Sequence, residues 1–219
     1  MTSVISPQRS QPVVERMVLQ NIAWDTFQAL IQDLAAQPGK RLTYDNGVLE
    51  IWMPFPPHES YKRWLVRLIE IVTEELDLEI RSLSASTWSR KDLAKGVDAD
   101  ECYYIQNEAA IRGKMVIDLM VDPPPDLAIE VDITSLSLPR LPIYRALGVP
   151  EIWRFNGERI VFLQWVAGEY QTTDRSAALP GVTVDAVQYL IEQARERGET
   201  SWAKTVRQWA REQLIGQQD

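Results

Sequence analysis

Hydrophobic and polar positions along the chain follow two periods, one typical of helices and one typical of strands. Apolar residues spaced three and four apart predict helices over residues 21–36 and 59–76. The segments RLTYD and VLEIWM flank Asn46-Gly47, a dipeptide that favours the tight turn of a β-hairpin. Further strands are predicted at EIRSL, STWSR, ECYYIQ, PDLAIEVDIT, PEIWRF, RIVFLQWV and GEYQTT.

Another helix is expected between the strand PDLAIEVDIT and Gly148. Thr134 or Ser135 can cap the start of this helix through a side-chain oxygen. Pro139 and Pro142 should lie in its first turn, where a proline costs no hydrogen bond. Gly148 should end the helix, because glycine readily adopts the left-handed conformation found there.

The order of elements is helix, hairpin, helix, strands, helix, strands and two C-terminal helices separated by Gly198. Such mixing predicts an α/β core in which a central mixed β-sheet is flanked by helices. The expected units are a flexible tail over residues 1–15, a core domain over 16–180 and a helical extension over 181–219.

Composition and charge narrow the class of protein. The 219 residues include 45% hydrophobic and 25% charged residues, the ordinary balance of a globular domain. The net charge of −8 argues against unspecific adhesion to a polyanion, although a local basic surface could still contact nucleic acid. Because Cys102 is the one cysteine and no apolar run reaches membrane-spanning length, we expect a cytoplasmic protein without membrane contact.

The strand PDLAIEVDIT carries acids although the rest of it is apolar. Side chains alternate along a strand, so Glu130 and Asp132 share the face of Ala128, opposite to Val131. Asp100, just ahead of the strand ECYYIQ, can meet these acids across the sheet. Buried like charges are unfavourable unless a positive group joins them, and magnesium prefers carboxylate and water oxygens. On spacing alone, a structural ion pair or an exposed acidic loop is the alternative to a magnesium site.

Several other kinds of chemistry lack the residues they need. His58 is the one histidine, which excludes a histidine-rich zinc site, and we expect it to be exposed or to cap a helix. The sequence contains no GxxxxGK[ST], GxGxxG or GxSxG motif, so nucleotide-kinase, dinucleotide-binding and serine-hydrolase functions are not indicated. Carboxylate chemistry is what remains.

Five segments together resemble the Uma-two family of restriction-endonuclease-like proteins, a branch of the PD-(D/E)xK nuclease superfamily. They are RLTYDNGVLEIWMP, HESYKRWLVRLIE, GVDADECYYIQN, PDLAIEVDIT and LPIYRALGVPEIWRFNG. The resemblance spans roughly residues 40 to 165, with the segments in the family's order. It implies a restriction-endonuclease-like α/β core and cleavage of DNA phosphodiester bonds that depends on Mg²⁺ or Mn²⁺.

The resemblance also implies roles for individual residues. The metal ligands of the family fall on Asp100, on Glu130 and on the backbone carbonyl of Val131. The superfamily commonly has a lysine two positions after the glutamate, and that position is Asp132 here. Members of this family often place the lysine four residues before the tyrosine of the IY pair, which is Arg140. Arginine can hold a phosphate by its permanent charge, but it is a poor proton shuttle.

Further residues could complete this site. An acid on the helix after the hairpin often joins the site in the family, and Glu59 is the best match for it, ahead of Glu70. Lys91 and Lys95 lie close enough to Asp100 in the sequence that either could supply positive charge.

The resemblance favours a metal-dependent endonuclease that acts on DNA. A nuclease-derived module that binds nucleic acid or protein without cutting, and a small-molecule hydrolase, are the alternatives. Restriction-type enzymes often dimerise to cut two strands. Trp202 and Trp209, seven residues apart on one helix face, could cover such a dimer partner or could simply close the core.

Overall fold

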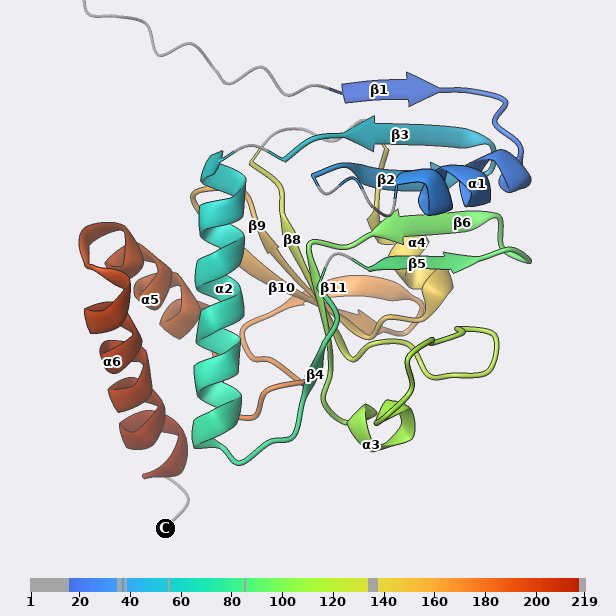
Figure 1. Ribbon diagram of the computed structural model, residues 1–219. Helices are drawn as coiled ribbons and strands as arrows, with labels where there is room; N and C mark the ends of the chain where they lie inside the picture. The colour runs from blue at the N-terminus through green and yellow to red at the C-terminus, as the bar shows by residue number, and fades with distance from the viewer. Residues whose placement is uncertain are drawn as a thin grey trace, which may run out of the picture.

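Two β-sheets form the framework of the computed structural model, which describes residues 16–34, 37, 39–54, 56–84, 86–133 and 138–216 (Figure 1). The first sheet is antiparallel, in the order β1 (Arg16–Leu19), β3 (Val48–Trp52), β2 (Arg41–Asp45), β6 (Lys95–Asp98) and β5 (Thr87–Arg90). The second sheet has the order β11 (Glu169–Thr173), β10 (Ile160–Val166), β9 (Glu151–Phe155), β8 (Leu127–Val131), β7 (Glu101–Tyr104) and β4 (Arg81–Ser82). The tail expected over residues 1–15 lies outside the described residues.

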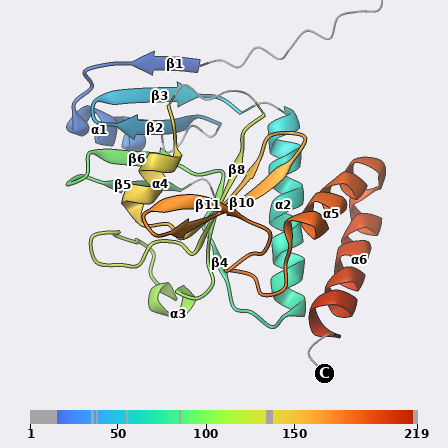
Figure 2. The ribbon, with the colours of Figure 1, turned by 180° about the vertical axis from the view of Figure 1, so that it is seen from behind.

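Helices cover both faces of the second sheet, whereas α1 (Trp24–Leu34) packs on the first sheet. The helices after α1 are α2 (Pro56–Glu75), α3 (Glu108–Ile111), α4 (Leu141–Leu147), α5 (Val184–Glu196) and α6 (Glu199–Ala210), followed by a π-helical turn over Arg211–Ile215. Figure 1 shows α2 upright along one face with α5 and α6 outside it, and Figure 2 shows α4 on the opposite face. Strands β8 and β9 run parallel, with α4 as the crossover between them. The predicted α/β class, with a mixed sheet flanked by helices, is confirmed.

The predicted hairpin is present, with the predicted turn. Asp45 pairs with Val48, so Asn46 and Gly47 alone connect β2 to β3. Their φ angles are 47° and 89°, the two positive values that a type I′ turn requires. The turn matches the right-handed twist of the strands, which explains why this dipeptide was a strong signal.

The antiparallel first sheet is more extensive than the sequence pattern indicated. Strand β6 was not predicted, because it is short and contains Gly96, a residue type depleted in strands. A Cβ atom at Gly96 would lie 2.6 Å from the ring of Phe27, so this glycine lets α1 pack directly on the sheet. Residues 99 and 100 alone separate β6 from β7, and the chain there passes from one sheet to the other.

The helix after β8 begins later than expected. Pro139 precedes α4 instead of lying in its first turn, whereas Pro142 does lie in the first turn. The residue before a proline is driven away from helical angles, so two prolines three residues apart shorten the helix from its start. Gly148 ends α4 in the left-handed conformation, as predicted. The caps expected at Thr134 or Ser135 lie outside the described residues.

The two faces of the second sheet pack against different partners. Leu127, Ile129 and Val131 belong to the cluster beneath α2, α5 and α6, while Ala128 packs with α4. The alternation expected for β8 is therefore observed. The face that carries Ala128 also carries Glu130, so this acid points toward α4 and not toward α2.

The C-terminal helices close the core over α2. Trp202 is fully buried, and its indole nitrogen donates a hydrogen bond to the backbone oxygen of Leu190 at 2.7 Å. Arg207 and Arg211 of this region both pair with Glu75 at the end of α2. Within the described residues, no helix is both long enough and apolar enough to cross a membrane.

We predict that stability falls with rising pH because of Glu101, which is buried on the α2 face of β7. Burial raises the pKa of Glu101 to about 7, although Lys62 opposes the rise, whereas an unfolded chain loses this proton near pH 4.3. The folded state thus binds the extra proton between these values, and its stability decreases across that window. Glu101→Gln should be more stable than the wild type by about 1–3 kcal/mol at pH 8, with no gain near pH 4.

Urea denaturation at both pH values measures this difference. Glu169→Gln, on the exposed edge strand β11, is the matched control and should change the unfolding free energy little. A gain for Glu101→Gln that is the same at pH 4 and pH 8 would contradict the assignment.

Candidate functional site

Asp100, directly before β7, lies opposite Glu130 of the neighbouring strand β8. Glu101 pairs with Ile129 in the antiparallel register of β7 and β8, and one further step places Asp100 opposite Glu130. Both carboxylates are buried. Asp100 Oδ2 accepts a hydrogen bond from the backbone amide of Val131 at 2.8 Å. The passage between the two sheets therefore holds two acids side by side in the interior.

His58, in the first turn of α2, is buried against Asp100. Its Nε2 lies 3.0 Å from Asp100 Oδ2, and its Nδ1 lies 3.2 Å from Glu59 Oε1. Burial opposes a charge on His58, yet the hydrogen bonds to Asp100 and Glu59 prevail and raise its pKa to about 9. The same contact lowers the pKa of Asp100 despite its burial. His58 is thus one of the positive groups that neutralise the acids.

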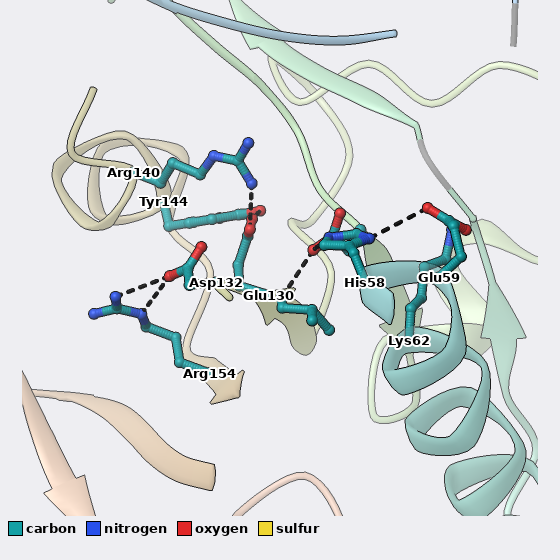
Figure 3. A network of polar contacts seen from close by, with 10 residues as sticks. His58, Glu59, Lys62, Glu130, Asp132, Arg140, Tyr144 and Arg154 are labelled. Carbon is teal, nitrogen blue, oxygen red and sulfur yellow. Dashed lines mark hydrogen bonds and ion pairs between the residues drawn. The ribbon is translucent and has the colours of Figure 1, made fainter. Parts of the chain in front are cut away.

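Arg140 is the second positive group, and it contacts Glu130 (Figure 3). Arg140 Nη1 donates to one Glu130 oxygen, and the hydroxyl of Tyr144, one turn along α4, donates to the other. The Arg140 guanidinium also lies 5.2 Å from the centroid of the Trp52 ring. Burial raises the pKa of Glu130 to about 8, with Arg140 opposing and Asp100 reinforcing the rise. The helix α4 thus delivers two donors to one buried carboxylate.

Asp132, the third acid of this strand, pairs with a different cation. Arg154 of β9 contacts Asp132 Oδ2 through Nε at 2.9 Å and through Nη2 at 2.8 Å. Figure 3 shows this pair beside Glu130 and Tyr144. Among the described residues, no group of three or more histidine, cysteine, aspartate or glutamate side chains is arranged to hold a metal ion. Asp132 therefore lies near the acid pair without forming a cluster with it.

The remaining sequence candidates lie farther from the two acids. Glu59 is half-exposed and reaches Asp100 only through His58, while Glu70 lies roughly 16 Å farther along α2. Lys91 pairs with Asp25, and Lys95 pairs with Asp45 at the opposite end of β6. The positive charge beside Asp100 and Glu130 therefore comes from His58 and Arg140.

Two residues of the site were not recognised in the sequence. His58 was expected to be exposed or to cap a helix, and this was wrong. Helical spacing contained the signal, because His58, Leu65 and Val72 are seven residues apart and all lie on the buried stripe of α2. Tyr144, whose hydroxyl donates a hydrogen bond to Glu130, was not proposed as a site residue.

The acid pair offers a limited set of ligands to a metal ion. Asp100 Oδ1 is buried without a hydrogen-bond partner, whereas both oxygens of Glu130 accept from Arg140 and Tyr144. Magnesium commonly uses one or two carboxylates and keeps several waters, so Asp100 and Glu130 fit this ion. Glu130 would have to share an oxygen with the cation, or release Arg140.

The chain is similar to a known protein family and to a solved structure. The sequence model of the Uma2 family, described as "Putative restriction endonuclease", matches residues 24–192. A solved structure described as "a putative nuclease belonging to DUF820 from Anabaena variabilis ATCC 29413" is similar, with 14% identity and a TM-score of 0.46. The similarity covers 68% of this chain and 90% of that chain. The search of curated proteins returned no match.

We predict that Arg140 makes Glu130 necessary for stability. Glu130→Leu removes both acceptor oxygens and leaves the buried Arg140 guanidinium and Tyr144 hydroxyl without partners, which should cost about 3–5 kcal/mol of unfolding free energy. The double substitution Glu130→Leu with Arg140→Met should recover most of this loss. Urea denaturation of the three proteins measures both effects.

Asp132→Leu is the matched control for this experiment. It also removes the acid of an arginine pair, directly after the same strand, but the side chain of Arg154 is 41% exposed, so the cost should be within about 1 kcal/mol. Equal losses in Glu130→Leu and Asp132→Leu would show that Arg140 does not depend on Glu130.

Proposed function

We propose, from the premise that this chain belongs to the Uma2 family of restriction-endonuclease-like proteins, that it hydrolyses DNA phosphodiester bonds with a divalent cation, Mg²⁺ or Mn²⁺. One observation carries the proposal. Asp100 Oδ1 is a buried acceptor without a donor, while Nε and Nη2 of Arg140 are buried donors without an acceptor. Unpaired buried groups are unfavourable, so a cation and a phosphate together would satisfy both sets.

The roles of the residues follow from their contacts. Asp100, Glu130 and the carbonyl of Val131 would hold the cation, which when bound supplies charge neutralisation and a more acidic water. His58 and the Val131 amide fix the orientation of Asp100, and Tyr144 fixes that of Glu130. Arg140 would donate its free Nε and Nη2 hydrogens to the scissile phosphate, stabilising the charge that develops there.

A DNA-binding module without cleavage is the second candidate. It is favoured by the two hydrogen bonds that occupy both oxygens of Glu130, since a cation must compete with Arg140 for them. In such a module the acid pair would only support the fold. The free donors of Arg140 could still bind a backbone phosphate.

The proposed enzyme is a homodimer located in the cytoplasm. A homodimer would present two acid pairs to the two strands of a duplex, which a single site cannot cut at once. A cytoplasmic location is consistent with Cys102, a free and buried cysteine that needs no oxidising compartment.

We expect the wild-type protein to cleave DNA with Mg²⁺ or Mn²⁺ and to be inactive with a chelator. Asp100→Asn should abolish cleavage and should weaken Mn²⁺ binding in calorimetry, because it removes one of the two carboxylates. Asp25→Asn removes the same charge at an exposed position and should change neither. Plasmid, linear duplex and single-stranded DNA are the substrates to compare. Cleavage that persists in the chelator would overturn the proposed metal dependence.

Substitutions at Arg140 distinguish a nuclease from a module that only binds DNA. If Arg140 stabilises the phosphate, Arg140→Lys should keep measurable cleavage and Arg140→Ala should lose roughly 2–4 kcal/mol of transition-state stabilisation. Arg145→Ala is the control on the same helix, because Arg145 lies over Trp165, away from the acids. Full activity in Arg140→Ala would reject Arg140 as the phosphate ligand. A wild type that binds DNA but never cuts it would favour the binding module.

A further inference from the structure

A cavity of about 440 Å³ lies next to the acid pair, between α1, the N-terminal turns of α2 and the ends of β2 and β6. Glu59 lines the cavity and also binds His58, which in turn binds Asp100. Asp98, the last residue of β6, lines it as well and lies two residues before Asp100 in the chain. The volume is within the range of pockets that hold small ligands.

The polar wall of the cavity contains both an unpaired acceptor and an unpaired donor. Asp98 is 6% exposed, and its Oδ2 accepts from the Leu42 amide at 2.8 Å while Oδ1 has no hydrogen-bond partner. Arg41 is 9% exposed, and its Nε also has no partner. Lys40 and Lys62 line the same cavity. Three cations and two carboxylates, the buried Asp98 and the half-exposed Glu59, thus line one cavity.

The other wall is apolar. Ile31 and Leu34 of α1 and Leu42 of β2 line it. A ligand that matches all of these surfaces has a flat apolar face, N–H donors on its edge and a negative charge at one end. A nucleotide has this combination, because its base offers a face and an N–H edge while its phosphate carries the charge.

We propose that this cavity binds one nucleotide of the substrate strand, with the base edge donating to Asp98 and the phosphate held by Lys40, Arg41 and Lys62. The inference rests on the proposed nuclease function and names the part of the substrate that the protein grips beside the cleavage site. A base in this cavity is out of its stack, so single-stranded or locally opened DNA is the expected substrate form.

Binding of mononucleotides tests the proposal without any cleavage. Calorimetry of the full chain in chelator should detect the four deoxynucleoside monophosphates, each bound more tightly than inorganic phosphate. Asp98→Asn should remove most of that difference, about tenfold for one hydrogen bond to a charged group. Lys62→Gln should weaken the binding of nucleotides and the binding of phosphate to the same extent. Lys91→Gln removes the same charge at an exposed site and should change neither.

A measurement on the wild type covers the case in which Asp98→Asn does not fold. The backbone amide of Leu42 donates to Asp98, so its NMR signal should move with nucleotides and not with phosphate alone. Equal affinity for phosphate and all nucleotides, no binding at all, or an unmoved Leu42 signal each overturn the proposal. Nucleotide binding by a protein that never cuts DNA would instead refute the nuclease function and leave the pocket in place. Cleavage of DNA without nucleotide binding would refute the nucleotide pocket and leave the nuclease function in place.

Discussion

Neutralisation of two buried carboxylates is the constraint on which the site depends. Asp100 and Glu130 lie opposite each other where the chain passes between the two sheets, and neither can be buried as an unpaired charge. Two helices bring the compensating charges, α2 through His58 and α4 through Arg140. The first turn of each helix is thereby fixed to the sheet junction. A fold with these acids in its interior needs both helix starts where they are.

The polar groups around the acids divide into satisfied and unsatisfied atoms. Asp132 with Arg154, and Glu130 with Tyr144, have their partners within the chain. Asp100 Oδ1 and two nitrogens of Arg140 do not, although they are buried. Interiors rarely tolerate such atoms unless an external group pairs with them. Stability thus explains most of the network, and the few remaining atoms are the ones that a ligand would use.

The sequence predicted the framework of the site better than its charges. Alternation along PDLAIEVDIT placed Glu130 opposite Val131, and the Asn46-Gly47 turn set the hairpin register, because both signals are local. Local patterns could not show that Arg140, ten residues after Glu130, returns to it through α4, nor that His58 reaches Asp100 from 42 residues away. Strand β6 was not predicted because it contains Gly96. A glycine is needed at this position because the ring of Phe27 leaves no room for a Cβ atom. These features depend on tertiary packing, which overrides local preference.

Arg140 links the two halves of the proposed chemistry. In the protein alone it is bound to Glu130, so a cation that needs the same oxygen meets a competitor. A phosphate beside Arg140 would offer the guanidinium another partner, and Glu130 would then be freer to bind the cation. Each ligand would lower the cost of binding the other, and such coupling must be reciprocal. The ion pair that stabilises the acids in the protein alone would therefore hold back cation binding until a phosphate arrives, so that the site assembles on its substrate.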